Sequence, residues 1–223
     1  MTTIYIATHN AHKKEEIKSF FENIPSFSEK YVIKGLDDLD FTGDIPETAD
    51  TLEGNALQKA MFIHRKYGVD CLADDTGLEV PALGNRPGVY SARYANMPED
   101  FEQTGKPDPQ SLRLPDPTFD RNIDRLLLKL QGKDPQARFR TVICLILHGR
   151  TYYFEGEVTG RILPQRQGSR GFGYDPVFRP DGFAESFAEL DLKAKNAISH
   201  RGRALASLAR FFDEEKDGSD TAR

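Results

Sequence analysis

The sequence has only two cysteines and no long apolar run. Cys71 and Cys144 both lie in apolar stretches typical of strands, so we expect buried thiols of a reducing compartment, not a disulfide or metal framework. No apolar stretch approaches the length that crosses a bilayer, and the amino terminus lacks the basic and apolar regions of a signal peptide. We therefore expect a cytoplasmic protein with no membrane partner.

The sequence also lacks an excess of positive charge. Its 30 Lys and Arg residues stand against 35 Asp and Glu residues, for a formal net charge of −5. A general nucleic-acid binder would need a basic face, so we expect no nucleic-acid polymer as a partner. Any polyanionic ligand must meet a local concentration of Lys and Arg. No internal repeat or coiled-coil pattern is present, and 223 residues are enough for a sizeable core.

The chain is organised around residues 69–77, where an apolar run is followed by Asp74, Asp75, Thr76 and Gly77. The run predicts a buried strand that ends at the two carboxylates. Buried carboxylates need hydrogen bonds, a cation or a metal, because an uncompensated buried charge is strongly unfavourable. Ligands of open α/β sheets bind at the carboxyl ends of strands. The alternative is that the two aspartates cap a helix or shape a turn.

The remaining apolar patterns predict alternating strands and helices, and hence an α/β fold. We predict strands at 3–7, 31–33, 138–147 and 151–162, and helices capped or opened by Asn10, Asp50, Asp116-Pro117 and Ser199. The two long strands are expected to form an antiparallel hairpin. Residues 37–44 are predicted to be a solvated loop, and residues 213–223 a polar tail. The segment 96–117 is predicted to be a surface excursion; it could be a plain insertion, a lid or a dimer contact.

Cations occupy the first turns of two predicted helices. Asn10 as a cap places Lys13 and Lys14 in one first turn, and Ser199 places His200 and Arg201 in another. The helix dipole disfavours cations there by about 0.3–1 kcal/mol. A phosphate-bearing ligand would explain them, because helix starts bind anions, whereas the alternative is that they point into solvent. Two such cases in a chain of net negative charge favour the phosphate, although the glycines of a P-loop are missing.

Two further segments each allow a structural and a functional interpretation. Asn55 and Lys59 lie off the apolar stripe of their helix, and solvent is the expected surrounding of Lys59. The loop Gly171-Phe172-Gly173-Tyr174-Asp175 could stack an aromatic ring on a planar ligand while Asp175 accepts from the ligand's donors. It could equally be a tight turn that plugs the core.

Taken as a set, the motifs of this chain resemble those of the Ham1-type noncanonical purine nucleoside triphosphate pyrophosphatases. In chain order they are Thr8-His9-Asn10-Ala11-His12-Lys13, Glu47, Asn55-Ala56, Lys59-Ala60, Ala73-Asp74-Asp75-Thr76-Gly77-Leu78, Pro87-Gly88-Val89-Tyr90-Ser91-Ala92-Arg93, Gly171-Phe172-Gly173-Tyr174-Asp175-Pro176 and Lys195-Asn196-Ala197-Ile198-Ser199-His200-Arg201-Gly202. Each motif alone is weak, but so many in the family's order are highly specific. Two departures are a longer segment at 96–117 and Arg170, where a small residue is common.

The resemblance implies Mg²⁺-dependent hydrolysis of ITP, dITP or XTP to the nucleoside monophosphate and pyrophosphate. It also implies an α/β fold with an elongated mixed β-sheet, flanking helices and two lobes around a central cleft. A single domain would span residues 1–212, with the surface insertion near 96–117, and the protein would be a homodimer. A purine base with a 6-keto group offers an acceptor where adenine offers a donor, so a cationic or donating site prefers the former.

The resemblance also implies roles for particular residues. Asp75 would be the general base for the attacking water, on or near the metal, with Glu47 coordinating Mg²⁺ and Asp74 supporting one of them. The substrate would be held at its phosphates by Thr8, His9, Asn10, Ala11, His12, Lys13 and Thr76, with Lys195 nearby, and at its base by Phe172, Gly173, Tyr174, Asp175, His200 and Arg201. A competing assignment makes Asp75 a metal ligand only.

Two rival functions remain open at this level. The first is a Maf-like pyrophosphatase that acts on pyrimidine triphosphates, which the nucleotide consumed would distinguish. The second is a nucleotide-binding module without turnover. The set Lys13, Glu47, Asp74 and Asp75 argues against the second, because a pure binder has little need of both a metal site and a base.

Overall fold

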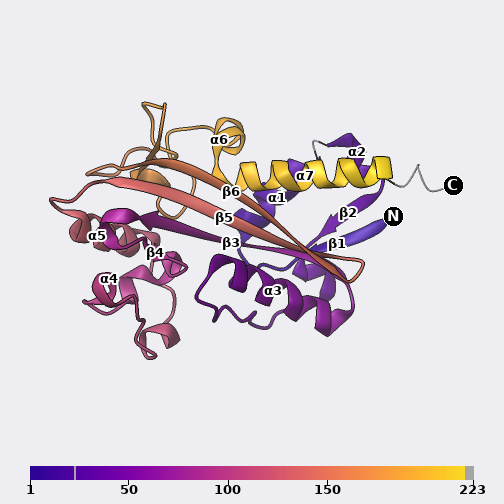
Figure 1. Ribbon diagram of the computed structural model, residues 1–223, viewed down its shortest axis with the longest axis horizontal. Helices are drawn as coiled ribbons and strands as arrows, with labels where there is room; N and C mark the ends of the chain where they lie inside the picture. Colours follow the sequence, from indigo (N-terminus) through magenta and orange to yellow (C-terminus); the bar gives the residue numbers. More distant parts are fainter. Residues whose placement is uncertain (23, 219–223) are drawn as a thin grey trace. The chain divides into compact units, whose positions relative to one another are not determined.

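The fold is a mixed α/β fold built on one seven-stranded sheet with the strand order β2-β1-β3-β5-β6-β7, in which β4 pairs with β3 (Figure 1). The computed structural model describes residues 1–22 and 24–218. The strands are β1 Thr2–Ile6, β2 Tyr31–Lys34, β3 Asp70–Val80, β4 Arg86–Gly88, β5 Gln136–Leu147, β6 Arg150–Ile162 and β7 Phe178–Pro180. Strand β1 runs parallel to both β2 and β3, whereas β4 and β7 pair antiparallel with their neighbours. The five predicted strands, which correspond to β1, β2, β3, β5 and β6, and the mixed α/β class are therefore confirmed.

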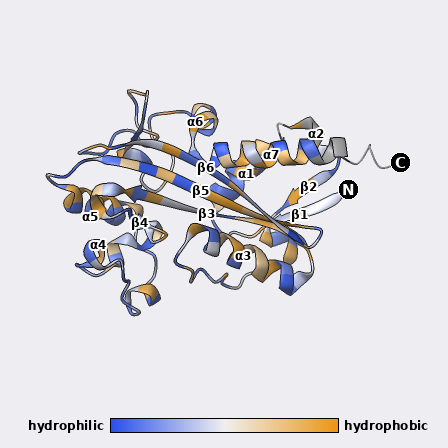
Figure 2. Ribbon diagram, viewed as in Figure 1, coloured by the Kyte–Doolittle hydropathy of each residue, from blue (hydrophilic) through white to orange (hydrophobic). Residues whose placement is uncertain are grey.

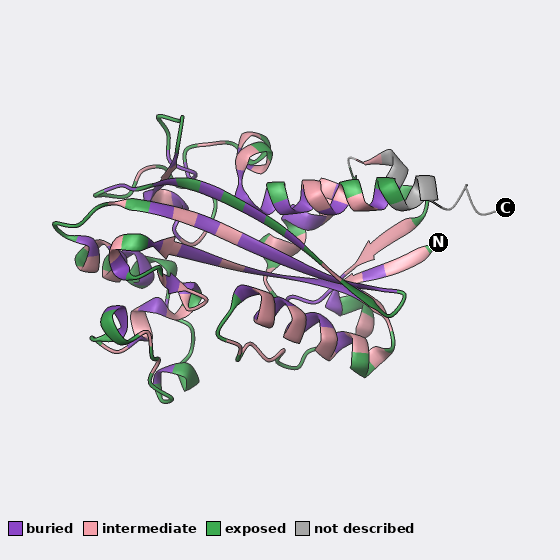
Figure 3. Ribbon diagram, in the orientation of Figure 1, coloured by how far each residue is buried: buried purple, intermediate pink, exposed green. Residues whose placement is uncertain are grey.

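The helices fall mainly where apolar residues recur at helical spacing. They are α1 Ala11–Glu22, α2 Pro25–Ser28, α3 Leu52–Tyr67, α4 Phe101–Thr104, α5 Phe119–Leu130, α6 Leu192–Ile198 and α7 His200–Gly218. Along α3 and α7 buried positions alternate with more exposed ones, as expected for amphipathic helices that cover a sheet (Figure 3). No helix of the described residues has the length and apolarity needed to cross a membrane.

The chain divides into two compact units, each with its own apolar core. Unit 1 comprises residues 1–75, 141–156 and 200–223, and unit 2 comprises residues 76–140 and 157–199. In unit 1, α1 and α7 pack on β1, β3 and β5 through residues such as Ile17, Leu72 and Leu208. In unit 2, Tyr94, Phe101 and residues of α5 form the core. The apolar colouring of β3 and β5 in Figure 2 follows these cores along the strands.

The hairpin between β5 and β6 forms as predicted. Its turn consists of His148 and Gly149, whose φ angles are +51° and +76°. Positive φ at both central residues is the signature of a type I′ turn, whose twist matches that of the flanking strands. Two neighbouring strands joined by so short a turn can only run antiparallel.

Several predicted boundaries are wrong. Strand β3 does not end at the carboxylates but continues to Val80, because β4 supplies new pairing partners from Leu78 onward. Helix α3 is capped by Thr51, not Asp50, and α5 starts at Phe119 behind the cap Thr118, two residues after Pro117. Hydroxyls in these positions accept from Gly54 N and Arg121 N.

The predicted loops also contain more structure than the sequence indicated. The stretch predicted as a solvated loop overlaps a 3₁₀ turn at Leu36–Leu39, which buries Leu36. The segment 96–117 contains α4 and a further 3₁₀ turn, and it buries Met97 and Phe101 in the core of unit 2. Helix α7 continues through the predicted tail to Gly218, and residues 219–223 lie outside the described residues.

Candidate functional site

Asp74 and Asp75 point to opposite faces of β3. Successive side chains of a strand alternate between faces. Leu72 packs in the core formed with α1 and α7, and Asp74, two residues on, shares its face. Cys71 donates its Sγ–H to Ala60 O of α3, so Asp75, four residues on, faces α3. The two neighbouring carboxylates therefore meet different helices and different partners.

Asp74 is fully buried between two cations. Its Oδ2 lies 3.2 Å from Lys13 Nζ of α1 and accepts from Arg201 Nε and Nη2 of α7 at 3.2 and 3.1 Å. Arg201 Nη1 also donates to Glu16 of α1. Burial alone would raise the pKa of Asp74, but Lys13 and Arg201 together hold it well below its ordinary value. Asp74 is therefore a permanent anion that ties the starts of α1 and α7 to the sheet.

These contacts change the explanation of the cations at the helix starts. Lys13 and Arg201 face buried carboxylates, and Lys14 pairs with Asp37 at 2.6 Å. The alternative that these cations point into solvent is wrong for Lys13 and Arg201. The inference that they call for a phosphate-bearing ligand is also weaker, because carboxylates of the chain itself compensate them.

Asp75 occupies a different environment on the α3 face. Its Oδ1 accepts from Lys59 Nζ at 3.1 Å and its Oδ2 from Asn55 Nδ2 at 3.1 Å. Lys59 Nζ also donates to Glu47 Oε1 at 2.5 Å, and its side chain is only 3% exposed. The predicted solvent exposure of Lys59 is therefore wrong. Asn55 and Lys59 are four residues apart, so they share one helix face and reach the same carboxylate.

The pKa of Asp75 is raised above its ordinary value. Burial is the largest cause, and the charge of Glu47 adds to it, whereas Lys59, Lys13 and the Asn55 hydrogen bond act in the opposite direction. The three carboxylates around Lys59 outweigh its own burial and raise its pKa. Two adjacent carboxyl groups thus have pKa values shifted in opposite directions, because one is paired with two cations and the other is buried beside a further carboxylate. We call Lys13, Glu16, Glu47, Lys59, Asp74, Asp75 and Arg201 the carboxylate–lysine cluster.

The loop between β1 and α1 carries the other residues predicted to hold phosphate. Asn10 Oδ1 accepts from Lys13 N at 3.1 Å, which confirms Asn10 as the cap of α1, and Thr8 Oγ1 accepts from Asn10 N at 3.2 Å. His9 Nε2 donates to Gly43 O at 2.8 Å. Ala11 and His12 are exposed in the first turn. These hydrogen bonds fix the loop before α1 and cap the helix, and Lys13 in its first turn lies beside Asp74.

Glu47 and Asp75 could hold a divalent cation. One oxygen of each approaches the same ammonium group, so the two carboxylates converge on a cationic position. No group of three His, Cys, Asp or Glu side chains among the described residues could hold a metal by itself. Mg²⁺ needs no such group, because it commonly takes one or two carboxylates and completes its shell with waters and substrate phosphates. The donor set fits Mg²⁺ bound together with a phosphate substrate.

The loop Gly171–Asp175, which we call the glycine-aromatic loop, lies in unit 2 and is organised by Asp175. Asp175 Oδ2 accepts from Phe172 N at 2.8 Å and from Lys195 Nζ at 2.7 Å. Gly171 has φ +76°, and a Cβ there would lie 2.1 Å from Asp175 Oδ2, so only glycine fits. Asp175 and Lys195 are both buried, whereas Phe172 is half-buried.

The two aromatic rings of this loop have different surroundings. Tyr174 is buried in the core of unit 2 and its hydroxyl donates to Ser91 O at 2.8 Å, so the core-plug interpretation describes this ring. The Phe172 ring has Lys195 Nζ 4.9 Å from its centroid and the ring of Phe119 6.3 Å away. Phe172 is thus the ring of the loop with surface left for a ligand.

The remaining predicted residues lie in the two units separately. Thr76 is half-buried in unit 2, directly after Asp75, and His200 is buried at the start of α7 in unit 1. The structure brings Lys13, Asp74 and Arg201 together, and Phe172, Asp175 and Lys195 together. Sequence reasoning assigned no role to Glu16. Its signal was its place three residues after Lys13, on the same helix face.

Comparisons with known proteins identify the family of this chain. The model of the Ham1 family matches residues 4–211. A dITP/XTP pyrophosphatase of Porphyromonas gingivalis is 46% identical over 95% of this chain and 98% of its own length. One of Flavobacterium johnsoniae is 44% identical over 92% and 95%.

Solved structures with the same fold include two Ham1 proteins. The Staphylococcus aureus protein has a TM-score of 0.76 at 33% identity, and the Coxiella burnetii protein a TM-score of 0.79 at 31% identity; each comparison covers 96% of this chain and all of the other. The family model matches residues 4–211, and the relatives and solved structures are more than 30% identical to this chain over nearly its whole length. The chain therefore belongs to the Ham1 family.

Proposed function

We propose that this protein hydrolyses noncanonical purine nucleoside triphosphates, namely ITP, dITP and XTP, to the nucleoside monophosphate and pyrophosphate. The observation that carries the proposal is the buried Asp75 with its raised pKa, next to a permanent anion, Asp74, and facing Lys59 and Glu47. The two relatives described above, both dITP/XTP pyrophosphatases, support the same substrate class.

Asp75 acts as the general base in this proposal. A base is most effective when its pKa lies near the working pH, and burial moves the pKa of Asp75 in that direction. Because the products are a monophosphate and pyrophosphate, the water attacks the α-phosphorus and the bond to the β-phosphate breaks. Asp75 takes the proton of that water, and Asn55 and Lys59 hold the carboxylate in place.

Glu47 and Asp75 hold Mg²⁺ in this proposal. When bound, Mg²⁺ neutralises charge that develops on the phosphoryl oxygens and orients the phosphates. The phosphate oxygens are held at the start of α1, where the helix dipole favours anions, by Thr8, His9, Asn10, Ala11, His12 and Lys13. Thr76 adds a hydroxyl. Asp74 supports this arrangement by keeping Lys13 and Arg201 in position.

The glycine-aromatic loop binds the base in this proposal. Phe172, with Gly173 beside it, provides the stacking surface, and the Lys195 ammonium group near that ring is a donor for a 6-keto oxygen. Tyr174, Asp175, His200 and Arg201 complete the set predicted for the base. For Tyr174 and Asp175 the contacts favour a supporting role, and for Arg201 the pairs with Asp74 and Glu16 favour holding the carboxylates.

Further parts of the proposal concern the whole protein. Residues 1–212 act as one nucleotide pyrophosphatase domain, in which the segment 96–117 is a surface insertion. The protein works in the cytoplasm as a homodimer, with neither a nucleic-acid polymer nor a membrane as partner.

The test is product release from a panel of nucleotides. Purified protein with Mg²⁺ is given ITP, dITP, XTP, GTP, ATP and dTTP, and pyrophosphate and phosphate are measured separately. We expect pyrophosphate from the inosine and xanthosine nucleotides, far faster than from GTP or ATP. Activity on dTTP alone would favour a pyrimidine-directed enzyme. Tight ITP binding without pyrophosphate release would favour a binding module.

A further inference from the structure

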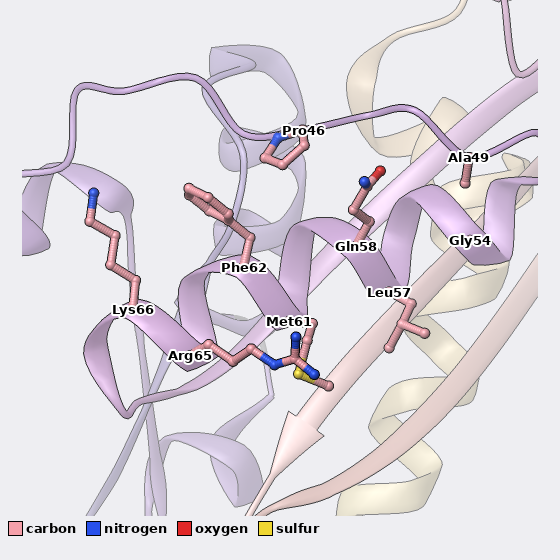
Figure 4. Close-up of a pocket in the computed structure, with 9 residues that line it drawn as sticks. All are labelled: Pro46, Ala49, Gly54, Leu57, Gln58, Met61, Phe62, Arg65 and Lys66. Atoms are coloured by element: carbon pink, nitrogen blue, oxygen red, sulfur yellow. The ribbon is translucent and has the colours of Figure 1, made fainter.

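An open pocket of about 820 Å³ lies between α3 and the segment that carries Glu47 (Figure 4). Its lining residues are Pro46, Ala49, Gly54, Leu57, Gln58, Met61, Phe62, Arg65 and Lys66. The side chains of Phe62 and Gln58 both leave α3 on the side of the segment at Pro46–Ala49 in Figure 4. The amide group of Gln58 is hydrogen-bonded to that segment.

The amide of Gln58 makes two reciprocal hydrogen bonds with Thr48, the residue after Glu47. Thr48 N donates to Gln58 Oε1 at 2.8 Å, and Gln58 Nε2 donates to Thr48 Oγ1 at 2.9 Å. One bond holds the backbone N–H of Thr48 and the other holds its hydroxyl, so a single planar amide fixes both the position and the orientation of this residue. The backbone of Thr48 is directly attached to Glu47.

The neighbouring contacts show that this part of the chain is held closely against α3. Ala49 N donates to Asn55 Oδ1 at 2.9 Å. A Cβ added at Gly54 would lie 2.6 Å from the Ala49 methyl group, so this contact leaves no room for a side chain at Gly54. Asn55, Gln58 and Lys59 are spaced at i, i+3 and i+4, and thus lie on one face of α3.

We propose that Gln58 is a positioning residue that sets Glu47 at its distance from Lys59 and Asp75, and thereby sets the affinity for the divalent cation. This inference rests on the proposed function for the cation but adds a residue outside the carboxylate–lysine cluster. One helix face holds both carboxylates: Lys59 and Asn55 contact Asp75, Lys59 contacts Glu47, and Gln58 fixes the backbone beside Glu47. We call the two hydrogen bonds between Gln58 and Thr48 the Gln58 clamp. Its loss would let Glu47 move away while Asp75 stays in place.

The test uses variants that remove the clamp in steps. Gln58→Met removes both hydrogen bonds at nearly constant volume, Thr48→Val removes only the one to the hydroxyl, and Thr48→Ser keeps both. Met61→Leu is the matched control, because Met61 lines the same pocket about one turn along α3. Melting temperatures confirm that all variants fold.

Three quantities are measured: Mn²⁺ binding to the nucleotide-free protein by water-proton relaxation, the Mg²⁺ concentration for half-maximal pyrophosphate release, and amide hydrogen exchange at Thr48. We expect Gln58→Met to weaken metal binding by about threefold to tenfold, the range that one or two ordinary hydrogen bonds supply. The metal affinity of Thr48→Val should lie between those of Gln58→Met and the wild type. Thr48→Ser and Met61→Leu should have the metal affinity of the wild type. Turnover at saturating Mg²⁺ should recover in every variant.

The outcomes separate this inference from the proposed function. Faster exchange at Thr48 with unchanged metal affinity in Gln58→Met would overturn the inference and leave the proposed function standing. Equal losses in Gln58→Met and Met61→Leu would also overturn it, because the effect would belong to the helix surface. A wild-type protein that binds no Mn²⁺ and needs no divalent cation would overturn the metal part of the proposed function, and the inference with it.

Discussion

Buried charges are compensated differently in two regions of the molecule, the carboxylate–lysine cluster of unit 1 and the glycine-aromatic loop of unit 2. The cluster gathers charged side chains from α1, α3, β3, α7 and the segment at Glu47, so each of its ion pairs joins two different elements. The loop is a run of five residues that depends on positive φ angles at two glycines, and its carboxylate pairs with Lys195, 20 residues further along the chain.

This difference predicts where each region is vulnerable. The cluster is sensitive to any change that leaves one of its buried charges without a partner, because a buried unpaired charge is far more unfavourable than an exposed one. The loop is sensitive to backbone geometry, because a side chain at Gly171 would collide with Asp175. An unpaired charge in the cluster should mainly lower folding stability, whereas a side chain added in the loop should mainly weaken ligand binding.

The largest effect on stability is expected for Arg201→Met. The change leaves Glu16 and Asp74, both buried, with one cation fewer, and should lower the free energy of unfolding by about 3–5 kcal/mol. Urea denaturation measures it. Lys14→Met is the control, because Lys14 also lies at a helix start but pairs with an exposed carboxylate, and it should change little. Equal effects of the two changes would contradict the contrast between buried and exposed pairs.

A smaller effect is expected from substitutions in the glycine-aromatic loop. Gly171→Ala should raise KM for ITP by about tenfold, because displacing Asp175 also displaces Phe172 and its stacking surface. Gly173→Ala is the matched control. Gly173 has φ +63° but no atom near the added Cβ, so only the backbone strain of about 1–2 kcal/mol remains. A larger rise in KM for Gly173→Ala than for Gly171→Ala would show that strain, not the contact with Asp175, governs the loop.

The same contrast explains what the sequence could predict. The mixed α/β class, five of the strands, the hairpin and the cap Asn10 follow from local periodicity and turn chemistry, because such signals lie within a few residues of each other. The short strands β4 and β7 were not predicted. The predicted end of β3 was wrong because the strand is continued by pairing with β4, and the local sequence pattern gives no sign of that partner. Thr51 and Thr118 replaced the expected helix starts because several residues nearby could serve as caps.

The sequence identified most of the residues of the candidate site, but it did not predict which side chains contact each other there. Asp74 and Asp75 were recognised as unusual, but their separation onto two faces appears only once β3 continues past them. Lys59 was expected in solvent because a lone lysine on a helix usually is; its burial depends on Glu47 and Asp75, which lie 12 and 16 residues away. The partners of Arg201 lie 127 and 185 residues away, beyond any periodic signal.

The most direct test of the central claim, that Asp75 is the base of a pyrophosphatase, is the turnover of Asp75→Asn at saturating Mg²⁺. We predict a loss of about 10²–10⁴-fold that added Mg²⁺ does not restore. The wild-type kcat/KM should rise with pH as Asp75 loses its proton at its raised pKa, and this limb should be missing in the variant. Recovery of turnover at high Mg²⁺, with the pH limb unchanged, would show that Asp75 is a metal ligand only and would contradict the account.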